Sequence, residues 1–361
     1  MKCLRGGTKL KNKNLLKSLS ESSGVSGYEN NLSEIIKEVF KPYSDKITKD
    51  SLGNLTITKW ADKKNENSID LMLAAHMDEI GLMVKSIDEN GFIRFTNIGG
   101  VDPRTLIAQE VTIHGKEDVI GIIGAKPPHL LSEKEKSKSL ELNKLYIDTS
   151  LDKEKIEEII TIGDMITLKR EFIDLENEIV SGKALDDRAG IVMLYECFKE
   201  LSYLKTKINV HAVSTVQEEV GVRGANTSTY NIDPDIGIAI DVCHGEMPGV
   251  ENDLVVDMNK GPAVAFGPHV HQDIFSKMKE IAEDIGIPYQ IEPWPHPAGT
   301  DAWAIQIAKS GVASALISIP LRYMHTSVET ISMKDVNSGG KLLAQFIARI
   351  DAEFVEGLRC Y

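Results

Sequence analysis

The chain has 361 residues, of which 42% are hydrophobic and 26% are charged, a composition typical of globular proteins rather than disordered chains. The formal net charge of −13 argues against nucleic acid as a main partner, because phosphate binding requires a basic surface. No apolar run approaches the ~18 residues that a membrane span needs, so we expect no membrane partner.

The four cysteines indicate a reducing compartment. They are far apart and form no Cys-x-x-Cys pair, which argues against a disulfide framework and against a cysteine zinc site. The basic N-terminus lacks the apolar core of a signal peptide, and we interpret it as a frayed start before the first helix. A cytoplasmic protein is therefore the expectation.

The first 80 residues alternate between helix-like and strand-like patterns. Apolar residues at helical spacing predict helices over Asn14–Ser23 and Asn31–Pro42. The alternating Leu55–Trp60 and the continuous apolar run Ile69–Ala75 predict two strands, the second buried on both faces. This second run leads directly into His76.

His76 and Asp78 stand at the end of that buried run. A single histidine there is more often a structural core residue. The His-x-Asp spacing, however, would let the carboxylate orient a metal-bound imidazole. Asp78 is therefore assigned a supporting role beside His76.

From about residue 81 to residue 172 the pattern changes to short β-like runs separated by glycines, prolines and charged turns. Such strands predict a small β-barrel or sandwich inserted into the chain. The runs are Leu82–Ile87, Phe92–Thr96, Glu110–His114, Val119–Ala125, Leu145–Asp148 and Met165–Lys169. The charged segment Ser132–Lys138 is predicted to be a solvated loop. Because the block shows no catalytic constellation, we expect it to serve interaction or gating.

Beyond residue 172 strands and helices alternate again, which predicts a doubly wound, mostly parallel α/β sheet. The predicted strands are Val180–Ala184, Ile208–Val216, Ile236–Ile240, Tyr289–Glu292 and Val312–Ile319. The predicted helices are Ile191–Leu201, Phe275–Ile285, Thr300–Ser310 and Met333–Phe354. The larger domain is thus expected to comprise residues 1–80 and 173–361, with residues 81–172 inserted.

Five of the predicted strands lead into a histidine or a carboxylate: His76, Asp186, Glu219, Asp241 and His325. The carboxyl ends of parallel strands meet at one edge of a sheet, so these side chains are expected to gather there. Two imidazoles and three carboxylates suit Zn²⁺, Co²⁺ or Mn²⁺, and no thiolate is available for a closed structural site. Taken singly, a helix N-cap or an acidic loop would explain each carboxylate; the repetition favours a metal site.

Charge favours two metal ions. Two divalent cations bring four positive charges and three carboxylates remove three, which leaves one for a bridging hydroxide. Each metal would then have one histidine, one terminal carboxylate and a shared aspartate. Glu218, adjacent to Glu219, would remain as the general base that moves the proton of the water.

Six stretches, in order along nearly the whole chain, resemble the tetrahedral (TET) and glutamyl-aminopeptidase-like family of di-metal aminopeptidases, some members of which are labelled endoglucanases. The stretches are AAHMDEIGLMV (74–84), GKALDDRAG (182–190), VQEEVGVRGA (216–225), IAIDVCHG (238–245), GTDAWAIQ (299–306) and RYMHTSVE (322–329). Together they make the resemblance specific.

The resemblance implies two metal sites: His76, Asp186 and Asp241 would hold one ion, and Asp186, Glu219 and His325 the other. The bridge would be Asp186 rather than its neighbour Asp187. Asp78 would orient His76, and Glu218 would be the catalytic base.

The resemblance also implies that residues 81–172 form a PDZ-like dimerisation domain. Dimers would build a hollow tetrahedral dodecamer that admits peptides rather than folded proteins. The expected activity is removal of N-terminal residues from peptides with a free amino terminus. Two Zn²⁺ or Co²⁺ ions per subunit are expected, with Mn²⁺ as a further candidate.

Two other classes of function stay open. Paired carboxylates could serve a glycosidase, although that reaction gives no role to His76 and His325. A non-catalytic, metal-binding assembly protein is the other class, although it has no need of the spare carboxylate Glu218. The sequence predicts neither the preferred N-terminal residue nor the physiological metal.

Overall fold

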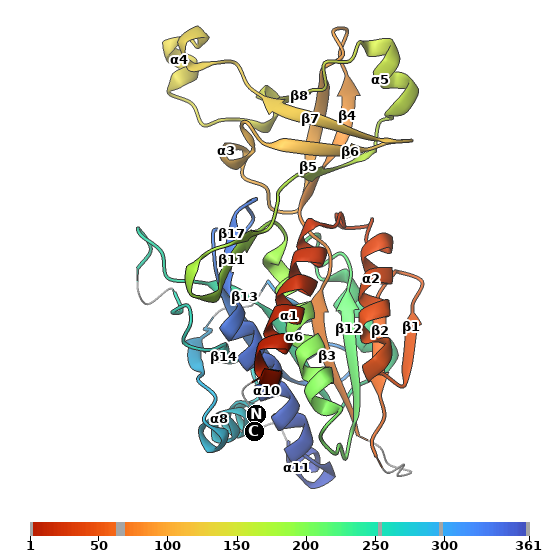
Figure 1. Cartoon of the computed structure of the whole chain (residues 1–361), viewed down its shortest axis with the longest axis vertical. Coiled ribbons are helices and arrows are strands. Elements are labelled where there is room, and N and C mark those ends of the chain that lie inside the picture. Colours follow the sequence, from red (N-terminus) through yellow and green to blue (C-terminus); the bar gives the residue numbers. More distant parts are fainter. Residues whose placement is uncertain (1–2, 63–68, 252–254, 296–298, 359–361) are drawn as a thin grey trace.

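The computed structural model describes residues 3–62, 69–251, 255–295 and 299–358. These residues form a layered α/β unit and a β-barrel, which stands above one edge of the sheet (Figure 1). None of the described helices is both long enough and apolar enough to cross a membrane.

Eleven strands form the sheet of the α/β unit within the described residues. Nine of them lie in the order β1 (Lys46–Lys49), β2 (Leu55–Lys59), β12 (Asn209–Thr215), β3 (Asp70–His76), β13 (Ile236–His244), β16 (Ala313–Arg322), β17 (Glu329–Ser332), β11 (Ile179–Gly182) and β10 (Ile173–Asp174). The other two are β14 (Ala263–Phe266), which pairs with β16, and β15 (Gln290–Pro293), which pairs with β14.

The prediction of a mostly parallel sheet is only partly correct. The central strands β12, β3, β13 and β16 are parallel, whereas β1, β2, β17, β11 and β10 join in antiparallel pairs. Short loops connect β1 to β2, β10 to β11 and β16 to β17. Such loops join antiparallel strands, because parallel neighbours need a longer crossover connection. The sheet is therefore mixed.

The strands that lead into the predicted site residues nevertheless all run in one direction. β11 is antiparallel to β17, which is antiparallel to β16, so β11 runs in the same direction as the parallel core. The carboxyl ends of β3, β12, β13, β16 and β11 therefore lie at the same edge. This is the edge that faces the barrel, because β3 leads directly into the first barrel strand (Figure 1).

Helices cover both faces of the sheet. One face packs against α1 (Cys3–Glu21), α2 (Asn30–Phe40), α6 (Leu185–Leu201), α8 (Gln272–Ile285) and α10 (Met333–Arg349) in a large apolar core. The other packs against α7 (Arg223–Ile232) and α9 (Asp301–Gln306) in a smaller cluster. Leu71 to Ala75 of β3 are completely buried, as predicted for a strand covered on both faces.

Two helices differ from their prediction. The first helix already begins at Cys3 and not after a frayed start. The buried Asn12 of α1 donates to Glu196 of α6 at 2.8 Å and to Asn337 of α10 at 2.6 Å, which ties the helix to its neighbours. The predicted helix Met333–Phe354 is divided, because Ile350 is extended and Asp351 caps a separate helix, α11 (Ala352–Gly357).

The barrel closes in the order β4-β5-β8-β7-β6-β9 around its own apolar core. Its strands are β4 (Gly81–Ile87), β5 (Ile93–Ile98), β6 (Glu110–His114), β7 (Asp118–Gly124), β8 (Tyr146–Asp148) and β9 (Met165–Leu168), with α3 (Pro103–Leu106), α4 (Glu133–Lys136) and α5 (Lys153–Ile159) between them. Every strand predicted here is present. The charged segment predicted as a loop contains α4, which a capping box of Ser132 and Glu135 stabilises.

Candidate metal centre

The site lies where β3 and β13 separate. Their pairing ends at Ala74 and Ala239; β3 continues beside β12 as far as His76, whereas β13 continues beside β16. His76 and Asp241 are each two residues beyond this last pair, so their side chains share one face of the sheet. Asp241 therefore lies within β13 and not at the end of a strand, because pairing with β16 extends β13 to His244.

The carboxylate of Asp186 lies between the two imidazoles. One of its oxygens is 3.1 Å from Nε2 of His76, and the other is 3.5 Å from Nε2 of His325. His325 Nε2 is also 3.3 Å from a carboxylate oxygen of Glu219. The structure thus brings together four side chains that are distant in the sequence.

Two groups of potential metal ligands result. In each group, one nitrogen or oxygen from every member lies within 4.8 Å of the others. The groups are His76, Asp186 and Asp241, and Asp186, Glu219 and His325. They share Asp186, and they have the same membership as the two sets that the resemblance implies.

The second nitrogen of each histidine is held by a backbone carbonyl group. His76 Nδ1 donates to the carbonyl oxygen of Asp78 at 3.1 Å, while the Asp78 carboxylate is 3.6 Å away. His325 Nδ1 donates to the carbonyl oxygen of Gly100 at 2.9 Å. Both Nε2 atoms therefore face the carboxylates, and each would offer its lone pair to a metal ion bound there. The predicted orientation of His76 by Asp78 is thus made mainly by the Asp78 backbone.

The carboxylate of Asp78 holds the two neighbouring glutamates instead. It is fully buried and accepts from the backbone N–H groups of Glu218 and Glu219 at 3.0 and 3.2 Å. Ser26 Oγ donates to the same carboxylate at 2.6 Å. Asp78 therefore fixes the loop that carries both glutamates.

Glu329 has a comparable role that the sequence reasoning missed. Its carboxylate accepts from the N–H groups of Leu185 and Asp186 at 2.7 and 3.1 Å and from the N–H of His325 at 2.9 Å. It thereby joins two segments that are more than a hundred residues apart in the sequence. Its presence in the stretch RYMHTSVE was the only signal.

A buried ion cluster supports the site from behind. Glu79 pairs with Lys183 Nζ at 2.7 Å and with Arg188 Nη2 at 3.0 Å. Arg188 also donates to the carbonyl oxygens of Leu19 and Ser22, both at 2.6 Å. Burial opposes ionisation of Glu79, but the two cations hold its pKa below the usual range. The cluster fixes the end of β3 against the start of α6.

The site concentrates carboxyl groups away from water. Burial raises the pKa of Glu218 to about 10, although His76 opposes this and the Asp241 carboxylate adds to it. Burial, together with the charge of Asp186, also raises the pKa of Asp241. Hydrogen bonds to Asp186 and Glu219 raise the pKa of His325 to about 11. Bound cations would offset the cost of burying these carboxylates in their ionised form, so the donor set fits divalent metal ions.

Asp187 differs from its neighbour Asp186. Its Oδ1 accepts from the N–H of Gly190 at 3.0 Å, and its Oδ2 has no hydrogen-bond partner among the described residues. Burial and the nearby Asp241 raise its pKa well above the usual value. Asp187 therefore faces the start of α6 and not the two imidazoles.

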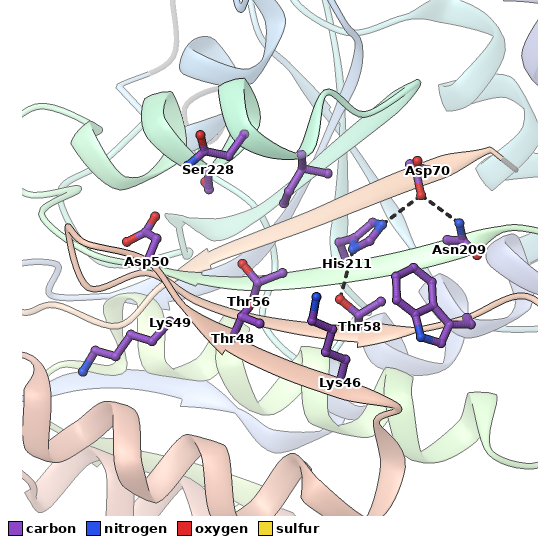
Figure 2. Close-up of a pocket in the computed structure, with 13 residues that line it drawn as sticks. Lys46, Thr48, Lys49, Asp50, Thr56, Thr58, Asp70, Asn209, His211 and Ser228 are labelled. Atoms are coloured by element: carbon purple, nitrogen blue, oxygen red, sulfur yellow. Dashed lines mark hydrogen bonds and ion pairs between the residues drawn. The ribbon is translucent and has the colours of Figure 1, made fainter.

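A polar hollow of about 530 Å³ lies elsewhere, on the sheet face beside β1, β2 and β12 (Figure 2). His211 belongs to it and contacts Asp70 Oδ1 at 2.9 Å and Thr58 Oγ1 at 3.1 Å. None of the seven predicted site residues is among the residues that line this hollow. His211 is therefore part of a separate polar network.

Comparison with known proteins places the chain in a class of peptidases and then in one family. The M42 glutamyl aminopeptidase family matches residues 53–342. The lysyl aminopeptidase of Pyrococcus furiosus is 37% identical over 91% of this chain and 94% of its own length. The chain belongs to the M42 glutamyl aminopeptidase family, as the six stretches indicated.

Solved structures agree with this assignment. The TET aminopeptidase of a marine sediment Thaumarchaeota archaeon is 33% identical, with a TM-score of 0.90 over 97% of this chain and 99% of its own. The Pyrococcus horikoshii TET1 peptidase, which can assemble into a tetrahedron or a large octahedral shell, is 32% identical with a TM-score of 0.82, covering 94% and 100%. A Thermotoga maritima structure named an endoglucanase is 28% identical with a TM-score of 0.76, covering 95% and 99%.

Proposed function

We propose that this peptide hydrolase is a two-metal aminopeptidase in which Glu218 is the general base. The observation that carries the proposal is the position of Asp186 between two groups of metal ligands, with Glu218 adjacent to Glu219 of the second group. A shared carboxylate flanked by two imidazoles is suited to a pair of ions.

The ligand groups indicate which residues would hold each ion. His76 and Asp241 would hold one, Glu219 and His325 the other, and Asp186 would contact both. Mixed nitrogen and oxygen donors suit Zn²⁺, Co²⁺ or Mn²⁺. When bound, such ions activate water and stabilise the negative charge that develops on the scissile carbonyl oxygen.

The protein's own groups then handle the proton. With cations bound, which would favour its ionised form, Glu218 would accept a proton from the attacking water and deliver it to the leaving amine. Asp78 keeps Glu218 in place through the backbone hydrogen bond at 3.0 Å, so its role is positioning. The free amino terminus of the peptide would bind beside one of the site's carboxylates, which would limit cleavage to the first residue.

We further propose that the chain forms homo-oligomers in the cytoplasm through its barrel, residues 81–172. Ile120 and Ile122 of β7 are 48% and 54% exposed, which gives the barrel an apolar surface suited to a partner subunit. The dodecamer and the tetrahedron formed by the related TET1 peptidase support a tetrahedral dodecamer, which would be built from dimers. Such a shell would admit peptides and exclude folded proteins.

The experiment is hydrolysis of a panel of aminoacyl-p-nitroanilides by the parent, by Glu218→Gln and by Glu117→Gln. Glu117 is exposed on the barrel and serves as the matched control. Each protein is measured after chelation and after addition of Co²⁺ or Zn²⁺. We expect metal-dependent turnover that collapses in Glu218→Gln alone, with intact metal binding. Full activity of Glu218→Gln would refute its role as base.

The endoglucanase name of one relative makes glycoside hydrolysis the second candidate. A glycosidase would use two carboxylates without metal ions. Cellulose hydrolysis that survives chelation would support this candidate, whereas metal-dependent cleavage of the anilides alone would exclude it. A non-catalytic assembly protein would show metal binding and no turnover in either assay.

A further inference from the structure

One strip of small side chains leads away from Asp241 across the sheet. Asp241 pairs with Ser318 of β16, and Ser318 pairs with Ala263 of β14. On β15, Glu292 pairs with Ala265, two residues beyond Ala263. Paired residues and alternate residues of a strand share a face, so all these side chains lie on the face that carries Asp241.

Glu292 is the one charged side chain on β15, and it is buried. Only 9% of the residue is exposed, and its Oε2 has no hydrogen-bond partner among the described residues. Burial raises the pKa of its carboxyl group to about 7, and the nearby Ser318 hydroxyl partly opposes this shift. A buried carboxylate without full pairing is costly, so its retention in the core needs an explanation.

No internal cation supplies that pairing within the described part of the chain. The strands β13, β14 and β15 contain no lysine or arginine. β16 has one, Arg322, whose guanidinium group binds the carbonyl and carboxylate oxygens of Glu246 at 2.5 and 2.8 Å. Among the described residues of these strands Glu292 therefore has no charge complement, and a bound cationic group would supply one.

Glu292 lies within reach of the proposed reaction centre. Ser318 lies on the strand next to that of Asp241, and adjacent strands are about 4.8 Å apart. The Glu292 carboxylate in turn approaches the Ser318 hydroxyl group. Cys243 is buried on the same face as Asp241. Burial raises the pKa of its thiol, and the charges of Glu292 and, to a smaller extent, Asp241 raise it further. A flexible four-carbon stem ending in an ammonium group suits this span.

We propose that Glu292 recognises the cationic side chain of an N-terminal lysine or arginine, which would make the enzyme selective for basic residues. This inference rests on the proposed aminopeptidase function. The side chains of Ser318, Ala263 and Cys243 along this strip are small and buried, and the aliphatic stem would lie along them while the Glu292 carboxylate pairs with the charged end. Glu292 is thus a specificity-determining residue for the substrate.

The test compares kcat/KM for lysyl, arginyl, leucyl and norleucyl p-nitroanilides in the parent, Glu292→Gln and Glu280→Gln. Norleucine matches the lysine stem without the charge, and Glu280 is an exposed residue of α8 that serves as control. We expect Glu292→Gln to lower kcat/KM for the two cationic substrates by about 10- to 100-fold, mainly through KM. Glu280→Gln should leave turnover of all four substrates unchanged, whereas Glu292→Gln should lower the ratio of lysyl to norleucyl kcat/KM.

A binding measurement keeps this inference separate from the proposed function. Titration calorimetry compares L-lysinamide with L-norleucinamide on the metal-loaded parent, with or without turnover. Tighter binding of lysinamide supports Glu292 even if no anilide is cleaved, an outcome that would overturn only the aminopeptidase proposal. Equal or tighter binding of norleucinamide, or an undiminished lysyl preference in Glu292→Gln, would overturn the role of Glu292. The comparison of lysinamide with norleucinamide needs only the parent protein. It can therefore refute the role of Glu292 even if Glu292→Gln does not fold.

Discussion

The carbonyl oxygen of Gly100 lies 2.9 Å from Nδ1 of His325. Gly100 belongs to the inserted block, whereas His325 follows the last parallel strand of the sheet. The contact fixes the imidazole so that Nε2 faces Asp186 and Glu219. The insertion therefore completes the candidate metal centre and is more than an accessory barrel.

Gly100→Ala should weaken the second group of ligands. A Cβ atom at this position would lie 2.8 Å from His325 Nδ1, so the ring would have to move. Because partners of a ligating histidine tune its affinity, we expect metal affinity and activity to fall by ~10- to 100-fold. Metal titration and kcat/KM check this, with Gly357→Ala as control because a Cβ there meets nothing within 4 Å. Unchanged affinity in Gly100→Ala would show that the contact is dispensable.

We expect Asp78→Asn to lower kcat in a protein that still folds. The amide cannot accept with both of its ends, so the N–H of Glu218 or Glu219 would lose its partner. A buried N–H without a partner costs ~1–3 kcal/mol, which predicts a fall in kcat of about 10- to 100-fold. Ser26→Ala removes only one hydrogen bond to the same carboxylate and should have a smaller effect. Equal effects of the two substitutions on kcat would contradict the positioning role.

Substitution by asparagine should abolish metal binding at Asp186 but not at Asp187. Asp186→Asn removes the shared ligand, so we expect the loss of both bound ions in metal analysis. Asp187→Asn should keep both ions, because the Asp187 carboxylate accepts from the N–H of Gly190 and belongs to neither group of ligands. Metal content after gel filtration distinguishes the two variants. Loss of metal in Asp187→Asn alone would reverse the assignment.

The carboxyl group of Glu292 should make the stability of the parent depend on pH. Its pKa is about 7 in the folded protein against 4.5 for an ordinary glutamate, so the folded state keeps a proton that the unfolded state has lost. The free energy of unfolding should therefore fall between pH 4.5 and 7, by roughly 3 kcal/mol relative to Glu292→Gln. Urea unfolding of both proteins at several pH values, without substrate, measures this difference. Parallel pH profiles would show that Glu292 does not titrate in this range.

The residue types of the candidate site and their positions in the chain could be read from the sequence. Apolar β-branched strands ending in histidines or carboxylates are a local pattern, and strand direction then brings those ends to one edge. The six strands of the barrel were also predictable, because glycines and charged turns separate them. The same local reasoning overestimated the parallel part of the sheet, since it did not register the hairpin returns at β10–β11 and β16–β17.

The tertiary structure alone decided how those residues are held. Gly100 reaches His325, Asp78 holds the N–H groups of Glu218 and Glu219, and Glu329 joins Asp186 to His325 across long separations in the chain. Most of these contacts involve backbone N–H or C=O groups, which every residue type carries and which therefore leave no mark in the sequence. The burial of Glu292 likewise depends on the pairing of β14, β15 and β16. Chemistry was legible from residue identity, whereas orientation arose only when distant backbone segments came together.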